Sequence, residues 1–235
     1  MPDDQRQTPV PRPAQNGAID AFLEAARRSV VPATGRGRLV FALDATMSRQ
    51  PTWDLAQRLQ GEMFATTAKQ GGLDVQLVYF RGFGECRASR FTPSGEGLAA
   101  LMSQIDCRGG RTQIAKVLRH VRDETKTTRV GALVYIGDAM EEKVDDLCAV
   151  AGELVLLGVK AFMFQEGATP GVATAYKEIA RLTGGAHVAF DARAPQKLAE
   201  LLGAAAAYAV GGMAELERRA SEGQEAARLL LARIG

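Results

Sequence analysis

The chain of 235 residues is long enough for one sizeable domain with appended segments, and its 46% hydrophobic and 24% charged residues exclude disorder throughout. Its 29 basic and 27 acidic residues give a formal net charge of +2, which is too balanced to indicate nucleic-acid binding. The three cysteines are widely spaced without a CxxC pair, which argues against a zinc knuckle and fits a reducing compartment. No secretory signal follows Met1 and no apolar segment is long enough to span a bilayer, so we expect a cytoplasmic protein that binds no membrane.

The beginning of the chain differs in composition from the rest. Residues 1–16 hold four prolines without apolar periodicity, which predicts a disordered tail. Residues 17–37 predict a short amphipathic helix and a linker, because Pro32 and the turn at Gly35 end the periodic segment.

Residues 38–210 alternate between short apolar runs and amphipathic segments. The apolar runs predict strands buried on both faces, and a more polar run predicts an edge strand. The predicted strands are Leu39–Leu43, Val75–Phe80, Glu85–Phe91, Val130–Ile136, Val159–Phe164 and Ala186–Phe190. The predicted helices are Thr52–Lys69, Gly97–Ile105, Thr112–Glu124, Lys143–Leu157, Ala173–Leu182 and Gln196–Val210.

This alternation determines the expected fold class. Strands joined through helices form right-handed crossovers, so the sequence predicts an α/β fold with a doubly wound, mostly parallel six-stranded sheet. Helices should cover both faces of the sheet, and one short antiparallel strand should lie at its edge. Residues 211–235 predict a further C-terminal helix, which the pair Gly211-Gly212 separates from the domain or kinks.

Three segments carry oxygen-bearing side chains, and the first and third of them directly follow predicted strands. The first places Asp44, Thr46 and Ser48 at alternate positions, a spacing that can aim three oxygens at one point. The second contains two glycines, which let the backbone approach a ligand, followed by Thr112 at the start of a helix. The third places Asp138 directly after an apolar strand. Since ligands of open parallel sheets bind beyond the carboxyl ends of the strands, we expect these segments to meet there.

The segment Asp44-Ala-Thr46-Met-Ser48 resembles the Asp-x-Ser-x-Ser signature of the von Willebrand factor type A (VWA) family. Thr112 and Asp138 stand where that family places its remaining ligands, and the resemblance covers roughly residues 38–202. It implies a Rossmann-like VWA fold and a metal-ion-dependent adhesion site (MIDAS). In such a site the hydroxyls bind a divalent ion directly, the aspartates act mainly through water, and an acidic group of a partner completes the coordination shell.

Two departures from the family pattern leave the oxygen donors in place. Thr46 replaces the usual first serine, and Ala139 replaces the glycine that often follows the second aspartate. The donor set lacks histidine and cysteine, which favours Mg²⁺, Mn²⁺ or Ca²⁺ over zinc or copper. Two aspartates balance only one divalent ion, so the predicted site is a receptor for acidic ligands rather than a sealed structural ion.

The residues beside these loops predict a partner-binding rim of arginine and apolar side chains. Its members are Arg49, Arg108, Arg111, Met47 and Met140, and Phe83 is a further apolar residue of these loops. A basic, partly apolar rim suits an acidic protein segment. The wider family implies a partner such as a subunit of a cytoplasmic complex, for example an AAA-type ATPase. The alternative is a solvated arginine face, with the methionines folded into the core.

Four acidic residues lie near the start of one predicted helix: Glu141, Glu142, Asp145 and Asp146. Their position predicts that they complement the dipole of that helix, with a role in metal binding as the alternative.

The sequence is compatible with three functions. The first is a non-enzymatic protein-binding module that uses the divalent ion. The second is a phosphotransferase-like hydrolase that uses Asp44, although such enzymes need a second aspartate where this chain has Thr46, and the chain has no Walker loop or Gly-x-Ser-x-Gly elbow. The third is a metal-free structural scaffold.

Overall fold

The computed structural model describes residues 36–68, 72–191 and 193–234, all of which belong to one compact unit. The side chain of Ser48 is not among the parts described. The predicted tail over residues 1–16 and nearly all of the helix and linker predicted over residues 17–37 lie outside the described residues.

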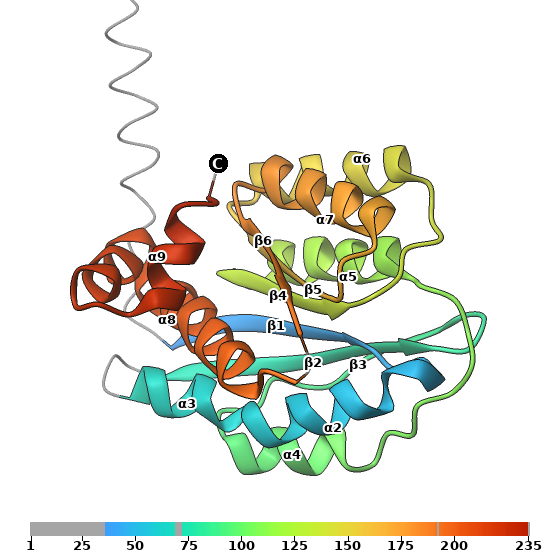
Figure 1. Ribbon diagram of the computed structural model, residues 1–235, viewed down its shortest axis with the longest axis horizontal. Coiled ribbons are helices and arrows are strands. Elements are labelled where there is room, and N and C mark those ends of the chain that lie inside the picture. The colour runs from blue at the N-terminus through green and yellow to red at the C-terminus, as the bar shows by residue number, and fades with distance from the viewer. Residues whose placement is uncertain (1–35, 69–71, 192, 235) are drawn as a thin grey trace, which may run out of the picture. The chain divides into compact units, whose positions relative to one another are not determined.

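A six-stranded sheet forms the centre of this unit (Figure 1). Five strands run parallel, and β3 pairs antiparallel with β2 at one edge, in the order β3-β2-β1-β4-β5-β6. The strands are β1 (Gly37–Asp44), β2 (Leu73–Arg81), β3 (Glu85–Ala88), β4 (Ala132–Gly137), β5 (Lys160–Glu166) and β6 (Ala186–Phe190). The predicted fold class, with its single antiparallel edge strand, is therefore confirmed.

Helices cover both faces of the sheet (Figure 1). One face packs against α2 (Gln50–Leu59), α3 (Gly61–Thr67), α4 (Gly95–Met102), α8 (Pro195–Ser221) and α9 (Glu225–Leu231). The other packs against α5 (Ile114–Thr127), α6 (Val144–Leu156) and α7 (Pro170–Leu182). Because neighbouring side chains of a strand point to opposite faces, Phe41 of β1 enters the first core and Ala42 the second.

Two of the predicted helices are divided in the structure. The helix predicted over Thr52–Lys69 breaks at Gln60 into α2 and α3, just before Gly61, a residue type with low helix propensity. The C-terminal helix predicted within residues 211–235 is interrupted at Gly223, whose φ of 92° favours glycine. The kink predicted at the Gly211-Gly212 pair is present, since Gly212 has a φ of 64° inside α8.

The alanine-rich part of α8 lies against the sheet. Ala205, Ala206 and Ala207 are fully buried, and these small side chains let the helix come close to the sheet. At the N-terminal ends of β1 and β4 a Cβ on Gly37 or Gly131 would lie within 3 Å of α8. None of the helices in the described ranges is both long and apolar enough to cross a membrane.

The buried histidine of β6 should make the stability of the fold depend on pH. His187 is 7% exposed, its Nε2–H group donates to Gln165 Oε1 at 3.0 Å, and burial, assisted by the charges of Lys177 and Arg233, lowers its pKa to about 4. A histidine in the unfolded chain has a pKa near 6.5, so the unfolded state takes up the proton more readily between these values. The contribution of neutral His187 to the free energy of unfolding is therefore complete above about pH 6.5 and is lost as the pH falls toward 4.

Between pH 7 and pH 5 the unfolding free energy of the wild type should fall further than that of His187→Gln, because glutamine does not titrate. We expect the difference between the two decreases to be on the order of 1–2 kcal/mol. Urea unfolding at the two pH values measures this difference, and each protein serves as its own reference at pH 7. Equal losses in the two proteins would contradict the assignment.

Candidate metal-binding and partner-binding site

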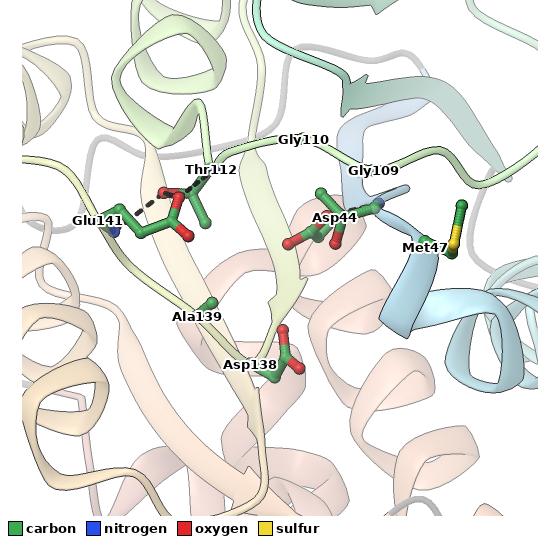
Figure 2. A pocket seen from close by; sticks show the side chains of 9 residues that line it. Asp44, Met47, Gly109, Gly110, Thr112, Asp138, Ala139 and Glu141 are labelled. Carbon is green, nitrogen blue, oxygen red and sulfur yellow. Dashed lines mark hydrogen bonds between the residues drawn. The ribbon is translucent and has the colours of Figure 1, made fainter.

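Three loops meet at the carboxyl end of the sheet, where β1 and β4 lie side by side and the chain crosses over between them. They line an open cavity of about 260 Å³, which is room for an ion and several water molecules. The cavity is lined by Asp44, Thr46, Met47, Gly109, Gly110, Thr112, Asp138, Ala139 and Glu141 (Figure 2). Four of the five predicted metal ligands, Asp44, Thr46, Thr112 and Asp138, thus line one cavity. The fifth is Ser48, whose side chain is not among the described parts of the structure.

The carboxylate of Asp44 is buried at the end of β1, with 3% of the residue exposed. Its Oδ1 accepts the backbone N–H of Thr46 at 2.8 Å, whereas Oδ2 is buried without a hydrogen-bond partner among the described residues. Burial raises the pKa of Asp44 to about 6; the charge of Asp138 adds to this effect, and the hydrogen bonds from Thr46 oppose it. A cation beside Oδ2 would offset the cost of burying this charge.

Asp138 follows β4 and has a similar arrangement. Its Oδ2 forms an ion pair with Arg49 at 3.0 Å, while Oδ1 is a second buried oxygen that lacks a partner in the described part of the chain. The loop itself is held from α7, because the Tyr176 hydroxyl donates to the carbonyl of Ala139 at 2.9 Å. Two unpaired carboxylate oxygens therefore belong to residues that line one cavity.

Arg49 does not lie on an exposed rim as the sequence predicted. Its side chain is only 4% exposed and also pairs with Glu166 at the end of β5, whose carboxylate accepts the hydroxyl of Thr52 as well. The guanidinium of Arg49 is buried between the carboxylates of Asp138 and Glu166, which follow or end two neighbouring strands. Among the described residues these two carboxylates have no other ion-pair partner, so the two negative charges compensate the cost of burying Arg49.

Thr112 is held in the cavity wall by Glu141, for which the sequence predicted a role at the helix dipole, with metal binding only as the alternative. The N–H of Thr112 donates to Glu141 Oε2 at 2.9 Å, and the N–H of Glu141 donates to Thr112 Oγ1 at 3.1 Å (Figure 2). A contact between residues 29 positions apart leaves no local pattern in the sequence. The carboxylate of Glu141 thus enters the cavity wall together with Thr112.

The interpretation that the acidic cluster complements the dipole of its own helix holds for Asp145 and Asp146, which lie in the first turn of α6. It is wrong for Glu141 and Glu142, because α6 begins only at Val144. Glu142 instead caps the neighbouring α5, accepting the N–H groups of Ile114 at 2.5 Å and Ala115 at 2.9 Å. It thereby fixes the start of α5 next to Thr112.

The remaining rim residues differ in exposure. Arg108 and Arg111 are exposed, and Met47 is 68% exposed beside the cavity. Met140 is only partly exposed and packs against the core beneath α5 to α7, so it offers less contact area than the rim prediction assumed. Phe83, at the turn between β2 and β3, is 86% exposed, and its neighbour Gly82 accepts the N–H of Arg111 at 3.0 Å.

The chemistry of the cavity fits a hard divalent ion. The polar side chains that line it offer oxygen alone, and two of the carboxylate oxygens are buried and unpaired. No group of three or more His, Cys, Asp or Glu residues that could hold a metal occurs within the described ranges. An ion here would therefore need the hydroxyls of Thr46 and Thr112 in addition to the two aspartates.

The two glycines before Thr112 have different roles. A Cβ on Gly110 would lie 2.2 Å from the carbonyl oxygen of Gly82, whereas a Cβ on Gly109 would meet nothing within 4 Å. The sequence suggested that both glycines let the loop approach a ligand, but Gly110 lets it pack on the turn that carries Phe83.

We expect Gly110→Ala to cost about 1–3 kcal/mol of unfolding free energy, because two segments of backbone must move apart. Gly109→Ala is the matched control and should change stability by less than about 0.5 kcal/mol. Urea denaturation of both variants tests this, and similar stabilities for the two would contradict the packing described for Gly110.

No family model and no curated protein matches this sequence. Solved structures with a similar fold include a von Willebrand factor type A protein from Catenulispora acidiphila, with a TM-score of 0.59 and 16% identity over 75% of this chain and 43% of that one. The SpRpn10 VWA domain matches with a TM-score of 0.55 and 10% identity over 69% of this chain and 95% of that one. The human COPII-coat protein Sec24c matches with a TM-score of 0.55 and 12% identity over 72% of this chain and 32% of that one.

These likenesses concern the fold, because the sequence identities are low. The chain spans less than half the length of the Catenulispora acidiphila protein and about a third of Sec24c. The mostly parallel six-stranded sheet with one antiparallel strand and flanking helices matches such a fold. The described part of the chain has a von Willebrand factor type A-like fold.

Proposed function

We propose that this chain is a non-enzymatic protein-binding module that engages an acidic group of a partner through a divalent ion. The observation that carries the proposal is the pair of buried, unpaired carboxylate oxygens, Asp44 Oδ2 and Asp138 Oδ1, on residues that line one cavity with two threonine hydroxyls. Mg²⁺ is the proposed ion, with Mn²⁺ or Ca²⁺ as alternatives of the same chemistry.

The proposed site divides its tasks between hydroxyls and carboxylates. Thr46, Thr112 and Ser48 would supply neutral oxygens, and the two aspartates would supply the negative charge. A donor set with few charges leaves the ion able to attract one more carboxylate, and that carboxylate would come from the partner.

The surroundings of the cavity suit an acidic protein segment. Arg108 and Arg111 are exposed beside it and would attract negative charge, while Met47 and Phe83 offer exposed apolar contact area. A partner within a cytoplasmic complex, such as an AAA-type ATPase, remains part of this proposal. It is supported by the occurrence of a similar fold in a COPII-coat protein.

The alternative of a hydrolase that uses Asp44 has less support. Thr46 stands where such an enzyme needs a second carboxylate. The two histidines are engaged elsewhere, His120 with Gln76 at 2.8 Å and His187 with Gln165 at 3.0 Å, and neither lines the cavity. The cavity therefore lacks a histidine that could act as a base.

Mg²⁺ should raise the melting temperature of the wild-type protein by roughly 5 °C at a concentration 100 times its Kd, because the ion binds only the folded state. Asp44→Asn should abolish this response, yet melt in EDTA at a temperature equal to or above that of the wild type, because it removes a buried unpaired charge. Thermal unfolding followed by circular dichroism measures both effects.

Asp106→Asn is the matched control, since its side chain is 83% exposed. It should retain the full Mg²⁺ response. Identical melting curves in EDTA and in excess Mg²⁺, Mn²⁺ and Ca²⁺, for both the wild type and a folded Arg49→Gln, would favour the metal-free scaffold.

Hydrolysis of p-nitrophenyl phosphate in the presence of Mg²⁺ distinguishes the module from the hydrolase. We expect the wild type to show no turnover above the buffer rate. Turnover that Asp44→Asn abolishes would overturn the proposed function in favour of a hydrolase.

A further inference from the structure

Arg49 is a buried cation among the carboxylates of the candidate site. Its guanidinium lies 3.0 Å from Asp138 Oδ2 and pairs on its other side with Glu166. Glu166 also accepts the Thr52 hydroxyl, so Arg49 and Thr52 tie the start of α2 to the end of β5. The guanidinium thus has fixed partners on both sides.

The pairing of Arg49 changes the charge balance of the cavity. Asp44, Asp138 and Glu166 carry one negative charge each, and Arg49, which like Asp44 is almost fully buried, neutralises part of this charge where solvent screening is reduced. A divalent ion in the cavity would be attracted to the same Asp138 carboxylate that Arg49 already contacts. The two cations would therefore share Asp138 and repel each other across it.

We propose that Arg49 is a resident counter-ion that shares Asp138 with the divalent ion and thereby keeps the affinity of the site for the ion low. This inference rests on the proposed function. Arg49 acts through Asp138 and is a positioning residue, which holds Oδ2 and leaves Oδ1 for the ion. The affinity of oxygen-donor sites for divalent ions rises with the number of uncompensated negative ligands, which Arg49 reduces.

Low intrinsic affinity has a consequence for partner binding. A carboxylate from the partner restores the negative charge that Arg49 compensates, so ion and partner raise each other's affinity by the same factor. The site would then hold its ion tightly only in the complex.

A purely structural role is the competing explanation, because the same ion pairs connect α2 with β5. The two explanations differ in their effect on ion affinity. Loss of a structural tie lowers stability and weakens or leaves unchanged the binding of an ion, whereas loss of a competing cation strengthens it.

The test is calorimetric titration of the full chain with Mn²⁺ and with Mg²⁺, with circular dichroism to confirm folding. Arg49→Gln should bind the ion roughly tenfold or more tightly than the wild type, because the repelling charge is gone. Arg49→Lys keeps the charge and should stay close to the wild type. Glu166→Gln is a conservative change that leaves Arg49 to Asp138 alone and should bind the ion several-fold more weakly.

The outcomes separate this inference from the proposed function. If the wild type binds the ion and a folded Arg49→Gln binds it no more tightly, the inference is overturned and the proposed function stands. If Arg49→Gln does not fold, an unchanged affinity of Glu166→Gln overturns the inference and a weaker one supports it. Ion binding by Arg49→Gln where the wild type shows none supports both, and no binding by any of these proteins overturns both.

Discussion

The parallel pairing of β1 with β4 brings two carboxylates to one edge of the sheet. Leu43 is level with Ile136, so Asp44 and Asp138 leave adjacent strands within about one residue of the same height. Neighbouring strands lie about 4.8 Å apart, and both of these are buried on both faces. Two negative charges in such a place need compensation, and the surrounding loops supply part of it.

The loops that carry the donors are held by contacts outside the donor set. Glu141 fixes Thr112, Glu142 caps α5, and Tyr176 holds the carbonyl of Ala139. Supporting hydrogen bonds of this kind keep polar side chains in place without a ligand. The cavity is therefore preformed, which lowers the ordering cost that an ion or a partner would have to offset.

The compensation that the structure contains is partial. Arg49 balances charge on Asp138 and Glu166, but the Asp44 carboxylate keeps an oxygen with no partner in the described residues, and its pKa is raised. This open cavity with only partly compensated charge is the setting of the ion that we propose.

The sequence alone determined the fold class and the set of loops that form the site. Apolar runs and helical periodicity are local properties, and the alternation of Asp44 with two hydroxyls lies within five residues of the chain. The predicted helix boundaries were less accurate at Gln60 and Gly223, where a short break inside an amphipathic segment leaves the periodicity almost unchanged.

Only the tertiary structure decided which side chains complete the site. Arg49 follows the signature directly and looks like a rim residue, yet Glu166, 117 positions away, holds it inside. Glu141 reaches Thr112 across 29 positions, and Gly110 packs on Gly82 from another loop. These contacts depend on charge compensation and close packing between segments that are distant in the chain, and neither effect leaves a periodic pattern in the sequence.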